Sequence, residues 1–189
     1  MSRVVNIGEG EKLSLTLLFI PGRPWDECEL EINLNGPGAE LDLAGLYLCT
    51  GTDNLGIRVT VRHNSEACVS RQTFKGIVGG SARTDFDGLI YVAHGAQKTG
   101  AFQESHSILL SRDARAESRP QLEIYADDVE CSHGATTGFL NQEEQFYMRS
   151  RGIPEDEARR LQMISFISPV LSRLDGPLQE EVLSKLMVL

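Results

Sequence analysis

The sequence lacks several features that would define its class at once. It has no Cys-x-x-Cys pair, and its four cysteines, Cys28, Cys49, Cys68 and Cys131, are widely scattered. It also lacks an excess of basic residues, since 18 Lys and Arg stand against 27 Asp and Glu and give a net charge of −9. This balance argues against a nucleic-acid-binding surface, and in a reducing compartment the cysteines are expected to be free thiols.

Long apolar runs are missing as well. The run from Leu15 to Ile20 is too short to span a bilayer or to form the core of a signal peptide, and acidic residues precede it. A chain of 189 residues with 41% hydrophobic residues can fold around one sizeable core, with room for a small second domain. We therefore expect a globular, cytoplasmic protein.

The common catalytic motifs are absent too. The segment "GIVGGSART" lacks the Gly-Lys-Ser/Thr end of a phosphate-binding loop, so the chain is not expected to hydrolyse ATP alone, and no Gly-x-Ser-x-Gly elbow occurs. Asp127 and Asp128 are adjacent, and in a strand they point to opposite faces, which argues against the paired carboxylates of a glycosidase.

What the chain does contain, from Val4 to about Ala135, is short apolar alternations broken by Gly, Asn and Asp. In "ELEINLN", the residues Leu30, Ile32 and Leu34 alternate with polar ones and occupy one face of a strand. No segment before residue 140 has the pattern of a three-turn helix. This part of the chain is predicted to consist of strands and turns.

Two short repeats indicate a coiled solenoid of strands. "FKGIV" at 74–78 and "FDGLI" at 86–90 lie 12 residues apart, and "HGAQKTG" at 94–100 is similar to "HGATTG" at 133–138. Such repeats suggest stacked coils whose corners need small residues. Irregular repeats also occur in β-sandwiches, so periodicity leaves both folds open.

After Gly138 the composition predicts helices. Asn141 with Glu144 three residues later is typical of a capped helix start. Pro154 is expected at the first position of a second helix, which Pro169 should kink or break, and a last helix should open at Pro177. We expect a strand domain at 1–138 and a helical domain at 139–189.

Within "ADDVECSHGATTG", residues 126–138, Cys131 and His133 are two positions apart and share one face of an extended strand. A thiolate and an imidazole suit zinc, copper, iron or an iron–sulfur cluster, but a stable site needs three or four ligands. The others could come from His63, His94 or His106, or from a second subunit. The alternative is a packed cysteine beside a surface histidine.

The run "PQLEIYADDVECSHGATTG" at 120–138 and "FYMRSRGIPEDEAR" at 146–159 closely resemble the C-terminal signature of the SufD/SufB family of iron–sulfur cluster assembly scaffolds. "FDGLIYVAHGAQKTGAFQESHSILLS" and, more weakly, "RHNSEACVSRQTFKGIV" extend the resemblance upstream. The form "CSHGAT" is similar to SufD rather than to SufB. Members of this family commonly run to more than twice this length, with an N-terminal helical domain and earlier coils, so the resemblance concerns their C-terminal part.

The resemblance implies a right-handed parallel β-helix, mainly β, followed by a small C-terminal helical domain. It also implies a non-enzymatic scaffold that pairs through its β-helix with a SufB-like subunit or a second copy of itself, and that docks a SufC-like ATPase through its helices. Cys131 and His133 would then bind a transient iron–sulfur cluster, with iron shared between subunits, and the chain would have no nucleotide site of its own. His63, His94 and His106 become structural residues.

Two alternatives remain open. One is a homodimeric module that binds the ATPase without cluster chemistry. The other is a carbohydrate-active β-helix enzyme, which would need a groove of acidic and basic residues on one face, and for which "RVTVRHN" and "ADD" are the only hints.

Overall fold

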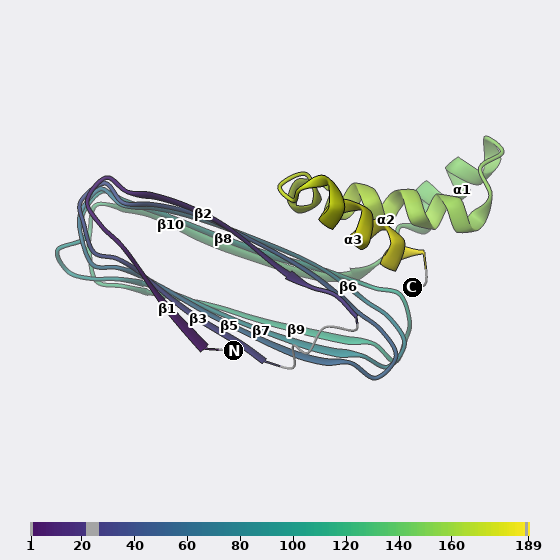
Figure 1. Cartoon of the computed structure of the whole chain (residues 1–189), viewed down its shortest axis with the longest axis horizontal. Coiled ribbons are helices and arrows are strands. Elements are labelled where there is room, and N and C mark those ends of the chain that lie inside the picture. The colour runs from purple at the N-terminus through teal and green to yellow at the C-terminus, as the bar shows by residue number, and fades with distance from the viewer. Residues whose placement is uncertain (1, 22–26, 188) are drawn as a thin grey trace.

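The computed structural model describes residues 2–21, 27–187 and 189 (Figure 1). These residues form ten strands that alternate between two facing sheets, followed by three helices. The strands are β1 (Ser2–Ile7), β2 (Lys12–Phe19), β3 (Glu27–Leu34), β4 (Glu40–Cys49), β5 (Asn54–His63), β6 (Val69–Val78), β7 (Arg83–Val92), β8 (Thr99–Leu109), β9 (Arg115–Ile124) and β10 (Val129–Phe139).

The strands form a parallel β-helix. One sheet has the order β1-β3-β5-β7-β9 and the other β10-β8-β6-β4-β2, and every neighbouring pair is parallel. One coil therefore takes one strand from each sheet, and Glu40 of β4 pairs with Val69 of β6, 29 residues later. The predicted fold class is confirmed, and the described residues up to Leu140 contain no helix.

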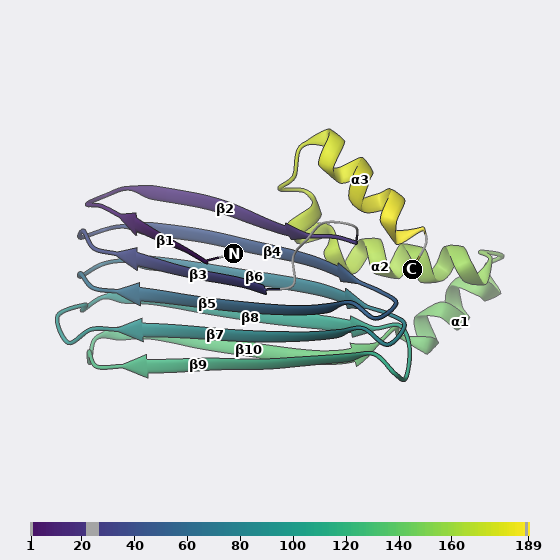
Figure 2. The same cartoon turned by 60° about the horizontal axis from the view of Figure 1, so that its bottom comes forward.

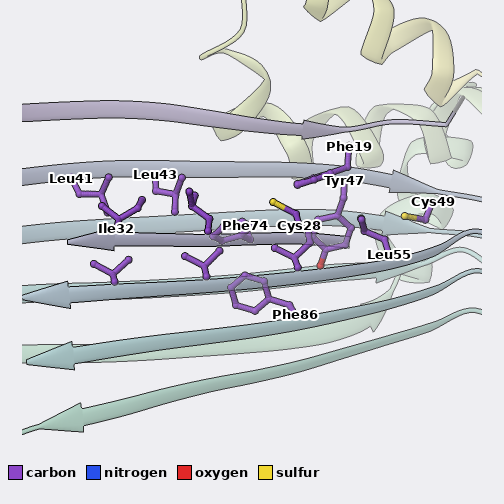
Figure 3. Close-up of a cluster of buried hydrophobic side chains, with 14 of the residues drawn as sticks. Phe19, Cys28, Ile32, Leu41, Leu43, Tyr47, Cys49, Leu55, Phe74 and Phe86 are labelled. Atoms are coloured by element: carbon purple, nitrogen blue, oxygen red, sulfur yellow. The ribbon is translucent and has the colours of Figure 1, made fainter. Parts of the chain in front are cut away.

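The prediction that the short repeats mark stacked coils is wrong, because the repeated residues do not lie at stacked positions. Phe74 of β6 and Phe86 of β7 lie on opposite sheets and pack their rings together, with centroids 4.6 Å apart (Figure 3). His94 lies in the turn after β7, whereas His133 lies inside β10. The 12-residue repeat relates facing strands of adjoining half-coils, and the solenoid period is much longer.

Side chains that alternate inward fill the interior of the first coils (Figure 3). Glycines make room for the largest of them: a Cβ on Gly76 would lie 1.8 Å from the Tyr47 ring, and one on Gly45 would lie 2.2 Å from Phe74. The Tyr47 hydroxyl and the Ser107 hydroxyl are 2.7 Å apart, and burial raises the pKa of Tyr47 to about 12. A large ring on one coil thus packs against a glycine on a neighbouring coil.

Corner residues stack in the same way. The side chains of Asn6, Asn35 and Asn64 form a ladder, in which Asn35 Nδ2 donates to Asn6 Oδ1 at 3.0 Å and Asn64 Nδ2 donates to Asn35 Oδ1 at 2.8 Å. The ladder ends one coil later, where Ala93 occupies the equivalent corner and its backbone N–H donates to the His63 carbonyl oxygen. Amides at a 29-residue spacing thus satisfy one another at the turns.

The helices are α1 (Gln142–Ser150), α2 (Glu155–Leu171) and α3 (Gly176–Leu186). The predicted cap is confirmed, because Asn141 accepts hydrogen bonds from the backbone N–H groups of Glu143 and Glu144. Pro154 is the residue before α2 rather than its first helical residue. Pro169 lies in the last turn of α2, which continues to Leu171, so the expected break falls two residues late.

The second and third helices cover one end of the outer face of the β2–β10 sheet (Figures 1 and 2). Ile167 and Val170 of α2 and Val182 of α3 are fully buried in a cluster with Leu46 and Ile77 of the strands. Polar contacts add to this packing: the Arg173 guanidinium donates to Asp42 at 2.8 Å, and Lys75 Nζ lies 4.8 Å from the centre of the Phe166 ring. The last strand ends at Phe139 and α1 begins at Gln142, while a division into two domains at 138/139 stays a prediction.

Within the described part of the chain, no helix is both long and apolar enough to cross a membrane. The run from Leu15 to Ile20 lies mostly in β2 and faces other strands and the helices.

His63 is fully buried at the end of β5. Its Nε2 lies 2.9 Å from the Ser70 hydroxyl, and burial lowers its pKa to about 4 from its ordinary 6.5. The ring is therefore neutral in the folded protein at neutral pH, and protonation at that site favours unfolding. His63 is a structural residue of the interior.

This burial predicts acid sensitivity. Because the folded pKa lies below the unfolded one, the stabilisation is complete above pH 6.5 and is lost as the pH falls towards 4, by about 3 kcal/mol in all. His63→Gln should flatten the stability profile over this interval in urea titrations. The matched control His94→Gln, at an exposed histidine, should retain the slope of the native protein. Equal slopes in all three proteins would contradict the assignment.

Candidate functional site

The last coil of the β-helix, formed by β9 and β10, has both of its strands at sheet edges (Figure 2). The interior-facing residues of β7 are buried, but their neighbours one coil later on β9 are only half-buried: Ala116, Ser118, Pro120 and Leu122. No further strand of the described chain covers them. The coil thus combines unpaired backbone groups with incompletely covered side chains, which is the pattern of a pairing edge.

One position of the β9 edge cannot donate a hydrogen bond. The Arg115 N–H donates to the Ala82 carbonyl and the Tyr125 N–H to the Val92 carbonyl, and the register between them is unbroken. Odd-numbered residues of β9 therefore point their N–H groups at β7, and even-numbered positions point theirs at the free edge. Position 120 is proline, so the edge lacks a donor there.

Cys131 and His133 lie on the same face of β10, as the sequence predicts, because the pairing register is regular: Cys131 lies beside Ala101 and His133 beside Gln103 of β8. Cys131 is half-buried against a small apolar cluster that includes Ile90 and Ala101. Burial raises the pKa of its thiol, the Ala101 backbone lowers it, and Glu130 raises it again. The thiol is therefore protonated at neutral pH unless a cation displaces the proton.

His133 is exposed, and among the described residues its ring has no hydrogen-bond partner. It lies in the middle of an open edge strand, two residues from the Cys131 thiol. An imidazole nitrogen in this setting can coordinate a metal ion that approaches from outside the coil.

The other histidines are not brought to this pair. His63 is buried in the interior, and His94 lies in a turn with its ring 5.4 Å from that of Tyr125. His106 lies on the outer face of β8, where its Nδ1 is 2.7 Å from the Thr136 hydroxyl and its Nε2 is 3.6 Å from Glu104. In the described residues no group of three His, Cys, Asp or Glu side chains is close enough to hold a metal ion.

Two interior residues that no sequence motif singles out lie in register with His133, one and two coils before it. Gln72 and Gln103 are buried in the interior, each 1% exposed, and Gln103 Nε2 donates to Gln72 Oε1 at 3.0 Å. Gln103 is 31 residues after Gln72 and 30 before His133, which is one coil in each direction. These three positions are related by the length of one coil, which the 12-residue repeat in the sequence does not indicate.

A second feature is an apolar groove of about 760 Å³ at the junction of β10 with the helices. It is lined by Ile108, Phe139, Leu140, Asn141, Glu143, Glu144, Tyr147, Met148, Leu161, Gln162, Ser165 and Phe166. Phe139 and Tyr147 are 63% and 60% exposed, and Phe146 beside them is 73% exposed. Exposed apolar side chains of this size are typical of surfaces that other molecules cover.

The outer face of the other sheet carries a ladder of charges. Arg119 contacts Asp85 at 3.3 Å, Asp87 at 2.6 Å and Glu117 at 2.9 Å, and Arg58 reaches Asp87 from the preceding coil. The hydrogen bond that Asp87 accepts from Arg119 lowers the pKa of the Asp87 carboxyl. A glycosidase requires a carboxyl whose pKa is raised so that it can donate a proton, and Asp87 has the opposite character. "ADD" lies in the turn before β10, away from this ladder.

The β-helix thus ends in two edge strands, β9 and β10, and has an apolar groove where β10 meets the helices. A family model described as "SUF system FeS cluster assembly, SufBD core domain" matches residues 22–166. The chain therefore belongs to the SufBD family of iron–sulfur cluster assembly proteins.

The similarity of the chain to individual curated proteins supports this assignment. The chain is similar to "Iron-sulfur cluster assembly protein SufD" of Escherichia coli (strain K12), with 38% identity over 154 residues that cover 81% of this chain and 36% of the relative. The SufD protein of Bacillus subtilis (strain 168) is 34% identical over 142 residues, 75% of this chain and 32% of the relative. "Protein ABCI7, chloroplastic" of Arabidopsis thaliana is 36% identical over 139 residues, 73% and 29%. The chain spans about a third of the length of these curated relatives.

The structure predicts which thiol reacts with solvent reagents. Cys28, Cys49 and Cys68 are buried, and Cys131 is half-buried. We expect one thiol of the native protein to react with an aromatic disulfide reagent, slowly at neutral pH and faster as the pH rises, because burial raises the pKa of Cys131. Cys131→Ser should remove this phase and Cys28→Ser should retain it. Loss of the phase in Cys28→Ser alone would show that the wrong thiol has been assigned.

Proposed function

We propose that this chain is a non-enzymatic scaffold subunit for iron–sulfur cluster assembly. The observation that carries the proposal is the placement of Cys131 and His133 on one face of an edge strand, where the described residues bring no third ligand to them. Two ligands are too few for a stable iron site, and an edge strand is where a second chain can add the others.

The partner that fits this edge is another open-ended β-helix, either a SufB-like subunit or a second copy of this chain. Both β9 and β10 offer unpaired backbone groups, so a partner with two free edges of its own could continue both sheets. Leu122 and Val129, half-buried in the single chain, would then be covered from outside. Cys131 and His133 would lie at the junction, where iron is bound transiently as cargo.

Family membership supports the cluster chemistry, because the matching domain and the relatives are described as cluster assembly proteins. The ATPase that drives assembly would be a separate SufC-like subunit docked on the helices. The exposed Phe146 and the groove lined by Tyr147 and Leu161 offer this subunit an apolar surface, which is typical of the core of a protein–protein interface.

Cluster assembly can be tested by anaerobic reconstitution with iron and sulfide, on the chain alone and with its co-purified SufB-like partner. We expect the double variant His133→Ala with Cys131→Ser to lose most of the visible absorbance and bound iron, because both ligands from this subunit are gone. The control His94→Ala, at an exposed histidine of a turn, should retain both. Equal iron content in the double variant and the native protein would refute the shared site.

A second candidate function is a homodimeric module that binds the ATPase without cluster chemistry. It would be supported if the native protein and all variants bound the ATPase normally and none bound iron under any condition. The observation that favours this second function is the half-buried position of Cys131, which raises the pKa of its thiol and so opposes metal binding unless iron displaces the proton.

Docking of the ATPase is tested separately at the groove. Tyr147→Ser with Leu161→Ser removes two apolar side chains from its wall, and we expect the dissociation constant for the SufC-like subunit to rise about tenfold or more. Met187→Ser is the matched control, since Met187 is 65% exposed but lies outside the groove. Isothermal titration calorimetry would measure both. Equal weakening by the control would place the docking surface elsewhere.

A further inference from the structure

A single column of interior side chains runs through four successive coils and ends at His133. Leu43 pairs with Gln72, Gln72 with Gln103, and Gln103 with His133, all in register on one face of the sheet. Neighbouring strands in a sheet are about 4.8 Å apart, so side chains at paired positions lie against one another. Gln103 is therefore the nearest interior neighbour of His133.

The amide of Gln103 is held in one place. Its Nε2 donates to Gln72 Oε1 at 3.0 Å, which fixes the nitrogen on the side of the preceding coil. Its plane lies against Gly88 of the facing sheet, where a Cβ would be 2.4 Å from Gln103 Oε1. The absence of a side chain at Gly88 thus makes space for the amide across the interior.

This arrangement leaves the oxygen of Gln103 without a donor. Gln103 Oε1 is buried and has no hydrogen-bond partner among the described residues. A buried acceptor left unpaired is destabilising, and a planar amide whose nitrogen faces Gln72 directs its oxygen away from Gln72. On that side the next coil supplies His133, whose ring is also without a partner.

We propose that Gln103 is a positioning residue that accepts a hydrogen bond from the ring N–H of His133. The bond would fix the tautomer and the orientation of the imidazole, so that its other nitrogen is presented at the open edge. Metal-binding histidines are generally oriented in this way by an acceptor on the second nitrogen. The inference rests on the proposed function for its purpose, but the hydrogen bond itself does not.

Two neighbouring polar groups are worse candidates for this role. The buried Ser105 hydroxyl also has no hydrogen-bond partner among the described residues. In the strand register, however, Ser105 lies beside Ala135, two residues after His133. Thr136 is on the outer face of β10 and already contacts His106 at 2.7 Å. Ser105 therefore provides a control in the same strand and on the same face.

Nitrogen NMR of the histidine rings tests the proposal in the metal-free 189-residue chain, with His133→Ala used to assign the signal. We expect one tautomer of His133 in the native protein and in Ser105→Ala. In Gln103→Met, which keeps the length of the side chain but has no acceptor, a mixture of both tautomers should appear. Gln103→Glu, which keeps an acceptor oxygen at this position, should restore the single tautomer. Circular dichroism would verify that each variant is folded.

Iron content after reconstitution supplies the second measurement. Gln103→Met should retain about tenfold less iron at limiting concentration, in line with the loss of an orienting partner. A His133 tautomer that is unchanged in Gln103→Met would overturn the proposal, whatever the iron content. If instead His133→Ala binds iron like the native protein while the tautomer depends on Gln103, the shared iron site fails and the positioning contact stands.

Discussion

The hydrogen-bonded register between strands one coil apart is the constraint on which the rest of the structure depends. Because each residue lies beside its counterpart about 29 residues away, like side chains form columns: Asn6, Asn35 and Asn64 at a corner, and Gln72 and Gln103 in the interior. A slip of one residue would turn every interior side chain outwards. The ladder therefore fixes the packing and the direction of each polar group at once.

The same constraint explains why the candidate site lies at one end of the solenoid. Inside the solenoid every strand has two neighbours, so interior groups are buried and their pKa values move towards the neutral form, as for His63. The last coil has a neighbour on one side only, so Cys131 and His133 inherit an ordered position from β8 while they remain accessible. An edge of this kind combines rigid placement with an open coordination side.

Much of the fold follows from local patterns. Alternation predicts the strands, Asn141 predicts the start of α1, and the i, i+2 spacing places Cys131 and His133 on one face. The 12-residue repeat does not predict the coil length, because Phe74 and Phe86 lie on facing sheets rather than at stacked positions of successive coils. The Gln72 and Gln103 column and the groove beside Tyr147 depend on contacts between residues distant in sequence, which no local pattern encodes.

The proline in β9 has a consequence for how far such molecules can assemble. A solenoid with a regular edge could stack end to end with identical molecules and grow into a filament. At position 120 the edge offers a ring in place of an N–H, so an added strand cannot form a continuous ladder there. Any partner that pairs with this edge, in a closed pair or in a longer stack, therefore forms one hydrogen bond fewer beside Pro120, which lowers the tendency of separate molecules to join edge to edge.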